Sequence, residues 1–253
     1  MVWGMAIPTS FGEFWPDGNF EGIDKSDNDL WGERLRLYYL AQPAEEQRRL
    51  YDYGDHHVGH GAGNYASYVT GKFKSELGTR APGKPVKPIF TLIQPHEAPR
   101  SFVTEKNYAI LGSLIALNFG LLAVDKVLKA IIERIEPDVH QFFPIEIQMP
   151  GGKVYSGKYY TLVIGEYIDS FLTSKSKQES WKDYGPEYPD VYSYKDSSKG
   201  ISGLALNQAK IRDAHLWRER SFTSILVCFS DALAGRIANA ELRIPKHYKM
   251  MEV

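Results

Sequence analysis

The residues best suited to chemistry form a short run of histidines. His56, His57 and His60 follow Asp55 within six residues, and imidazole and carboxylate groups are the usual zinc ligands. His56 and His60 would share a helix face at a spacing of four, but Gly59 between them weakens a helix. No glutamate stands beside His56, where a zinc peptidase carries its base. Two interpretations stay open, a metal-dependent hydrolase and a solvated loop without metal.

Other catalytic patterns fail on spacing or surroundings. Residues 78–84 read G-x-x-x-x-G-K, but Pro85 stands where a phosphate-binding loop needs Ser or Thr for magnesium. Residues 152–158 repeat the spacing and are predicted to form a hairpin loop. No G-x-S-x-G pattern is present, and Cys228 lies in an apolar run typical of a buried, inert thiol. We predict no catalytic residues and no cofactor, although a Ser, a His and an acid could still converge in space.

An acidic segment with interleaved aromatic residues runs from Glu13 to Glu33. It holds seven acids against the single base Lys25. Acids steer a basic partner into contact, and aromatic rings supply the strongest contacts in interfaces. The predicted partner-binding residues of this segment are Trp15, Asp17, Glu21, Asp24, Asp27 and Asp29. The alternative is a solvated loop with a few rings buried in the core.

A second candidate contact segment covers residues 181–194, where aromatic rings alternate with acids and prolines. Tyrosines give large contact area at little loss of side-chain entropy, and proline reduces the entropy lost on ordering a loop. The predicted partner-binding residues here are Trp181, Tyr184, Tyr188, Asp190 and Tyr192. The alternative is a lid whose rings fold back onto the core.

Composition describes a globular protein without a whole-chain charge bias. The 253 residues are 43% hydrophobic, and 30 Lys plus Arg nearly balance 31 Asp plus Glu. Neither nucleic acid nor a membrane surface is predicted as a partner. One cysteine cannot form an internal disulfide, and residues 1–20 do not read as a signal peptide, which favours the cytoplasm. The uncharged run 107–124 approaches the length of a membrane span, but Asn and Gly dilute it, and we predict core helices instead.

The elements that must position these segments divide the chain at residue 87. Residues 1–87 are predicted to be rich in loops, with a strand at 30–40, where Leu and Tyr alternate with Arg, and a short helix at 44–53 after Pro43. Residues 78–88 read as a linker. Residues 88–253 are predicted to form an α+β domain of their own.

In the α+β domain, a helical segment precedes a mainly antiparallel sheet. We predict helices at 103–117 and 121–135, strands at 143–149 and 159–164 joined through a Pro-Gly-Gly turn, and a polar insert at 174–200. Strand-like apolar runs follow at 204–206, 215–218 and 225–229. Ser230 is a predicted N-cap for a closing helix at 231–240, whose Asp231 complements the helix dipole. Trp217 is expected in the core, and Arg218 beside a carboxylate.

Seven short motifs in this half follow a recognisable order. They are Phe102-Val103-Thr104-Glu105-Lys106, Val139 to Ile147, Tyr159-Tyr160-Thr161-Leu162, Ile168-Asp169-Ser170, Ser174 with Ser176, His215-Leu216-Trp217-Arg218, and Phe229-Ser230-Asp231-Ala232-Leu233. Together, over residues 101–240, they resemble a bacterial family of immunity proteins of polymorphic toxin systems, formerly a domain of unknown function.

The resemblance implies a cytoplasmic α+β protein that binds a toxin made by its own cell or by kin and blocks it without catalysis. The acidic and tyrosine-rich segments lie outside the motifs, so we expect them to select the toxin. The acids favour a basic toxin such as a nuclease. The rival predictions are a metal-dependent hydrolase using His56, His57 and His60, and a structural protein that self-associates.

Overall fold

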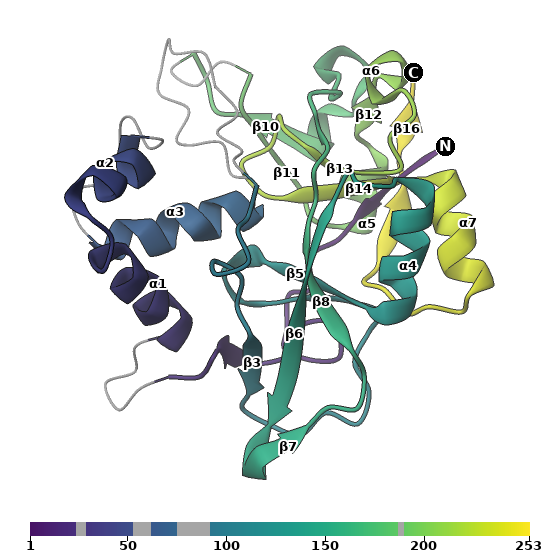
Figure 1. Ribbon diagram of the computed structural model, residues 1–253. Coiled ribbons are helices and arrows are strands. Elements are labelled where there is room, and N and C mark those ends of the chain that lie inside the picture. The colour runs from purple at the N-terminus through teal and green to yellow at the C-terminus, as the bar shows by residue number, and fades with distance from the viewer. Residues whose placement is uncertain (24–28, 53–61, 75–91, 187–189) are drawn as a thin grey trace.

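The computed structural model places two β-sheets between layers of helices (Figure 1). It describes residues 1–23, 29–52, 62–74, 92–186 and 190–253. Helices α1, α2 and α3 lie on one side of the sheets, and α4 and α7 lie together on the other (Figure 1). The predicted α+β class is confirmed. The predicted domain boundary at residue 87 falls outside the described residues and stays a prediction.

Three helices form the N-terminal layer: α1 (Leu30–Leu40), α2 (Ala44–Asp52) and α3 (Ala62–Lys74). The helix predicted at 44–53 is confirmed, but the strand predicted at 30–40 is wrong. Asp29 begins α1 by accepting hydrogen bonds from the backbone N–H groups of Trp31 and Gly32, both at 3.2 Å. Trp31 and Leu35, four residues apart, are buried on one helix face. The buried side chains therefore follow the spacing of a helix, although apolar residues and Arg alternate along the sequence as they would in a strand.

A seven-stranded mixed sheet carries the centre of the molecule. Its strands, in spatial order, are β2 (Gly18–Phe20), β3 (Ser101–Thr104), β6 (Gln141–Met149), β8 (Tyr159–Val163), β5 (Leu122–Asp125) and β4 (Leu114–Ala116), and β7 (Lys153–Val154) pairs with the outer end of β6. β3 runs parallel to β6, and the other neighbouring pairs are antiparallel. The strands predicted at 143–149 and 159–164 are thus confirmed.

The helix predicted at 103–117 is wrong, and the one predicted at 121–135 is right only from residue 126 onwards. Residues 101–104, 114–116 and 122–125 are strands, and α4 (Lys126–Ile135) begins where Asp125 Oδ1 accepts the backbone N–H of Leu128 at 2.8 Å. The run 107–124 lacks charge because β4 and β5 are buried on both faces. A strand of this kind has the same apolar pattern as a buried helix.

The edges of the seven-stranded sheet approach each other, because the sheet curls. Beyond β4, the backbone N–H of Ala116 donates to the carbonyl of Phe14 at 2.8 Å. The side-chain amide of Asn118, in the turn between β4 and β5, donates to the carbonyl of Gly18 in β2 and to Asn19 Oδ1. The β4–β5 turn is therefore fixed beside β2.

A second sheet of five strands joins the two ends of the chain. Its order is β15 (His247–Lys249), β1 (Val2–Met5), β14 (Leu226–Ser230), β13 (Leu216–Glu219) and β9 (Tyr167–Ile168). Strands β13 and β14 confirm the predictions at 215–218 and 225–229. Ser230 Oγ accepts the backbone N–H of Leu233 at 3.2 Å and begins α7 (Asp231–Asn239), as predicted.

Smaller elements complete the C-terminal half. They are the hairpin of β10 (Trp181–Asp183) and β11 (Tyr192–Tyr194), the parallel pair β12 (Ala205–Leu206) and β16 (Met251–Glu252), and the short helices α5 (Ser198–Ser202) and α6 (Gln208–Ile211). They lie on the polar insert predicted at 174–200 and on the segments around it.

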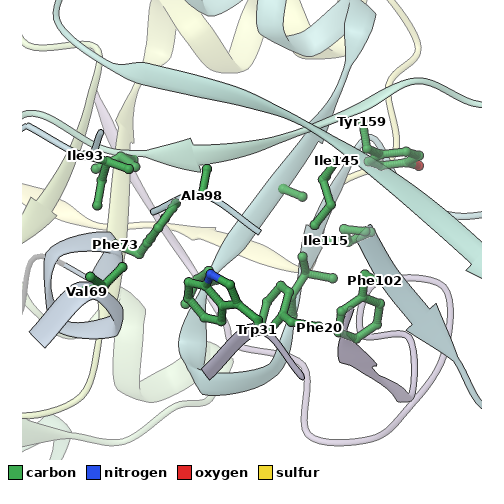
Figure 2. Close-up of a cluster of buried hydrophobic side chains, with 14 of the residues drawn as sticks. Phe20, Trp31, Val69, Phe73, Ile93, Ala98, Phe102, Ile115, Ile145 and Tyr159 are labelled. Carbon is green, nitrogen blue, oxygen red and sulfur yellow. The ribbon is translucent and has the colours of Figure 1, made fainter. Parts of the chain in front are cut away.

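Buried apolar side chains form clusters on either side of the large sheet. One lies between the N-terminal helices and the sheet, where Figure 2 shows Phe20, Trp31 and Phe102 gathered together. The ring of Phe20 is 5.0 Å from Trp31 and 5.2 Å from Phe102. Another cluster packs α4 and α7 against both sheets through Leu128 and Leu233. Removing this much apolar surface from water is the main force that holds the layers together.

A buried ion pair fixes α3 to the segment that leads into β3. Lys72 Nζ donates to both carboxylate oxygens of Glu97, at 2.7 and 2.5 Å, and only 4% and 2% of the two side chains are exposed. Tyr65 OH and the backbone N–H of Gln94 also donate to Glu97. Burial lowers the pKa of Lys72, although the pair with Glu97 works in the opposite direction. The buried carboxylate of Glu97 is therefore surrounded by a cation and two further donors.

Replacing Lys72 by Met is expected to lower the free energy of unfolding by about 3 kcal/mol, because Glu97 would keep a buried charge without its cation. The control is Glu133→Gln, which removes the 47% exposed partner of Lys129 from an ion pair and is expected to cost less than about 1 kcal/mol. Urea unfolding measures both. Equal losses for the two variants would contradict a structural role for the buried pair.

Candidate functional site

Several acids of the predicted N-terminal contact segment are bound by other residues of the chain. Glu33 Oε2 and Oε1 accept from Arg36 Nε at 2.6 Å and Nη2 at 2.7 Å, and Glu13 pairs with Arg243. Asp24 and Asp27 lie in 24–28, outside the described residues. The segment therefore combines acids that hold its own structure with acids whose placement the structure leaves open.

Glu21 makes the most extensive of these contacts. Arg34 donates to it through Nε at 2.9 and 3.1 Å and Nη2 at 2.7 Å, and the backbone N–H of Arg100 donates at 3.0 Å. The same guanidinium donates to the carbonyls of His96 and Ala98. Burial works to raise the pKa of Glu21, but the hydrogen bonds and charges of Arg34 and Arg100 outweigh it and leave the pKa lowered. Glu21 thus links the end of β2 to α1.

Asp29 and the neighbouring rings are also part of the fold. Asp29 caps α1, and burial raises its pKa against the two backbone N–H groups that donate to it. Trp31 is 1% exposed, and its indole donates to the carbonyl of Glu97 at 2.9 Å. Phe20 is fully buried. These rings match the alternative in which part of the segment is held in the core.

Trp15 and Asp17 lie nearer the surface, before β2. The ring of Trp15 is partly buried and lies 4.7 Å from Phe11, which is 48% exposed. The backbone N–H of Asp17 donates to Tyr108 OH at 2.8 Å, and its carbonyl accepts from the backbone of Glu105 at 2.9 Å. The backbone at Asp17 is therefore fixed, and its partly exposed side chain lies at the start of β2.

The tyrosine-rich segment is the β10–β11 hairpin, and its base packs on the core. Trp181 lies opposite Tyr194, and both contact the cluster that contains Phe171 and Phe222. Ring centroids are 5.6 Å apart for Phe171 and Trp181, and 5.1 Å apart for Phe171 and Tyr192. The rings at the base match the alternative of a lid folded onto the core.

The tip of the hairpin faces solvent. Tyr184 is 51% exposed, and its hydroxyl lies 3.4 Å from Thr223 Oγ1. Asp190 is exposed, with a positive φ of 60°. Tyr188 lies in 187–189, outside the described residues. The structure therefore separates the predicted residues of this segment into a partly buried base, with Trp181 and Tyr192, and an exposed tip.

The predicted metal ligands His56, His57 and His60 fall in 53–61, for which the structure gives no placement. Within the described ranges, no group of three or more His, Cys, Asp or Glu side chains could hold a metal ion. The G-x-x-x-x-G-K run at 78–84 also lies outside these ranges. The hydrolase prediction stays untested at its own residues.

Two other sequence predictions concern β13 and β14. Cys228 is fully buried, as expected, and burial raises the pKa of its thiol well above the ordinary value. Trp217 is fully buried in the core, as expected. Arg218 is 2% exposed, and the carboxylate expected beside it stays a prediction.

A Ser and a His side chain do meet in space, at a hollow of about 240 Å³ between β1, α6 and α7. His215 Nδ1 lies 2.7 Å from Ser230 Oγ, which also caps α7. Glu136, however, accepts the backbone N–H of His215 at 2.6 Å and binds the imidazole of His140 at 2.9 Å. The acid fixes the backbone of β13, so the group lacks the order of nucleophile, base and orienting acid.

Glu219, at the end of β13, is one of the buried carboxylates that sequence reasoning missed. Its oxygens accept the backbone N–H and hydroxyl of Ser170, the hydroxyl at 2.6 Å, and the backbone N–H of Ser221 at 3.3 Å. Burial raises the pKa of Glu219 to about 7, against these hydrogen bonds, which lower it. No local pattern marks a glutamate as buried, because its partner Ser170 lies 49 residues away.

No helix in the parts of the chain that the structure covers is long and apolar enough to cross a membrane. The uncharged run 107–124 holds strand β4 and most of strand β5.

The fold and these surfaces define a mixed α+β protein with an acidic segment and an aromatic hairpin. The Immunity protein family (Imm11) matches residues 36–252, and the chain belongs to this family. The resemblance inferred over 101–240 is confirmed and extends further towards the N-terminus. A search of curated proteins finds no match. Membership of an immunity family implies a cognate toxin as the partner.

Glu219→Gln is expected to change how stability depends on pH. Because the folded pKa of about 7 exceeds the ordinary value of 4.5, wild type loses stability as pH rises through this range, and the loss is complete above about 7. The difference between the two pKa values corresponds to about 3 kcal/mol in the free energy of unfolding. The variant stays neutral, so its free energy of unfolding should rise relative to wild type by about this amount between about pH 5 and 8.

Denaturant unfolding at several pH values measures this difference, with Glu105→Gln at an exposed position as the control for removing a negative charge. Parallel profiles for wild type and Glu219→Gln would show that the carboxylate ionises in the folded protein as it does in the unfolded chain.

Proposed function

We propose that this protein binds a cognate bacterial toxin and neutralises it by occluding the toxin's active site, without catalysis of its own. The observation that carries the proposal is the family match over residues 36–252. In this proposal the protein acts in the bacterial cytoplasm, needs no cofactor, and binds neither nucleic acid nor a membrane directly. A stable blocking complex needs roughly 800 Å² of complementary surface on each partner.

The first proposed contact surface is the acidic segment, with Trp15, Asp17, Glu21, Asp24, Asp27 and Asp29. Arg34 and the start of α1 already hold Glu21 and Asp29, so these two position the surface. We assign the charge that meets the toxin chiefly to Asp24 and Asp27. A basic toxin such as a nuclease would be steered towards them, since acids can mimic the phosphates that such an enzyme binds.

The second proposed contact surface is the β10–β11 hairpin, with Trp181, Tyr184, Tyr188, Asp190 and Tyr192. The base of the hairpin is packed on Phe171, and this support favours a rigid contact. The half-exposed ring of Tyr184 and the exposed Asp190 would meet the toxin directly. A rigid aromatic contact loses little entropy on binding.

Co-expression is expected to rescue growth from the toxin. Tagged protein captures its stoichiometric partner from the source cell, and that partner, expressed alone in a test strain, should arrest growth. Co-expression with this chain should restore plating efficiency to that of a strain with empty vectors, because occluding the active site abolishes the toxic activity. The purified toxin's activity should fall to zero at one equivalent of this protein.

An unrelated acidic protein expressed at the same level is the control for nonspecific relief. Growth arrest that persists although the two proteins copurify would contradict neutralisation. Inhibition by much less than one equivalent of this protein would indicate catalysis, which would contradict the proposal that it acts by stoichiometric binding.

Charge reversal in the acidic segment is expected to slow association. Asp24→Lys with Asp27→Lys should lower the association rate constant about tenfold at low salt, because the steering field is lost. Added salt should lower the wild-type rate constant towards that of the variant. Stopped-flow binding to the purified toxin measures both. The control is Glu133→Lys with Glu146→Lys, at exposed sites outside the segment, and an equal effect there would remove the segment from the proposal.

A further inference from the structure

The turn between β4 and β5 holds Phe119 in a backbone conformation that phenylalanine rarely adopts. Phe119 has φ 58° and ψ 17°, and Gly120 follows with φ 74°. The backbone N–H of Leu121 donates to the carbonyl of Asn118 at 3.3 Å, which closes a tight turn. This is the geometry of a type I′ turn, whose first central position favours Asn, Asp or Gly. A bulky side chain there is strained, because its Cβ crowds the backbone.

The ring that this strained residue carries is not needed to fill the core. Phe119 is 51% exposed, and its ring centroid lies 6.2 Å from that of Phe20, which is already buried between Trp31 and Phe102. An aromatic residue that is both strained and half in water gives little to folding. Persistent backbone strain of this kind concentrates at sites of function.

The turn is also held rigidly from its first residue. The side-chain amide of Asn118 donates to the carbonyl of Gly18 and to Asn19 Oδ1, both in β2. The backbone N–H of Leu117 donates to the carbonyl of Leu121 at 2.8 Å on the other side of the turn. A ring presented on such a fixed turn loses little entropy when a partner covers it.

Phe119 adjoins the exposed tip of the β10–β11 hairpin through one short segment, residues 223–225. A methyl group on Gly120 would lie 3.2 Å from both Ile225 Cδ1 and Lys74 Cδ, so the turn meets this segment at one end and the last residue of α3 beside it. At its other end, Thr223 Oγ1 lies 3.4 Å from the hydroxyl of Tyr184. Thr223 and Ser224 between them are exposed. Two half-exposed rings thus stand on either side of a short strip in which residues 223–225 carry no charge, with the side chain of Lys74 beside the turn.

We propose that Phe119 is a contact residue for the cognate toxin and, with Tyr184, borders one continuous aromatic surface. The inference rests on the proposed function and adds a residue from a different part of the chain to the hairpin surface. Because residues 223–225 carry no charge, the matching toxin surface would be an apolar pocket that receives the ring of Phe119, with Lys74 at the edge of the contact. Aromatic rings in such pockets carry much of the binding energy of an interface.

The test combines stability with binding. Phe119→Asn places a residue suited to the turn, so the thermal midpoint should rise by about 2 °C, while affinity for the toxin rescued in the growth test should fall about tenfold or more. Phe119→Tyr keeps the ring and the strain, so it should bind within about threefold of wild type. Val127→Asn, at a residue 52% exposed on α4, is the control for losing an exposed apolar side chain and should bind as wild type does.

Each other outcome overturns the inference in a recognisable way. A lower thermal midpoint for Phe119→Asn would mean that the ring is needed for folding. Unchanged affinity would mean that the toxin does not touch it. If wild type dimerises in sedimentation and Phe119→Asn is a monomer with full affinity for toxin, a second copy of the chain covers the ring. Failure of wild type itself to rescue growth would instead defeat the proposed function, and the inference with it.

Discussion

The N-terminal layer depends on one buried carboxylate, that of Glu97. An unpaired charge at this depth would strongly disfavour folding. The folded structure therefore requires all the donors to the Glu97 carboxylate to be in place. Lys72 and Tyr65 come from α3, and the indole of Trp31 in α1 donates to the backbone carbonyl of the same residue. Both helices are thereby fixed to the segment before β3. Trp31 also belongs to the apolar cluster that contains Phe20 (Figure 2).

The sequence was most informative where one local pattern decides one element. Strand β6 follows from alternating apolar residues, and α7 from Ser230 at its start, because period and capping are local properties. The errors come from patterns that two structures share. Within 30–40, Leu35, Leu37 and Tyr39 alternate with Arg34, Arg36 and Tyr38, which predicted a strand. Asp29 at the start and the buried face formed by Trp31 and Leu35 make this segment a helix instead. The strands within 107–124 look helical because both of their faces are buried.

The functional surfaces were harder to read, because charge and aromatic content do not say what a side chain already contacts. Glu21 counts as an acid of the acidic segment, but its carboxylate is bound by Arg34, thirteen residues away. Trp181 and Tyr184 share one tyrosine-rich segment, yet the first packs on Phe171 and the second faces solvent. Phe119 carries no sequence signal beyond the Gly that follows it. Its interest comes from a backbone angle that only a three-dimensional structure gives.

Strand β1 has a consequence for how the chain is made. It lies between β14 and β15, with Gly4 opposite both Cys228 and Tyr248, so its neighbours are separated from it by most of the chain. During synthesis these first residues leave the ribosome long before their pairing strands exist. Contacts so distant in sequence also form slowly. The complete five-stranded sheet can therefore form only after β15 has been translated. Until then, β1 in each new molecule lacks both of its neighbouring strands.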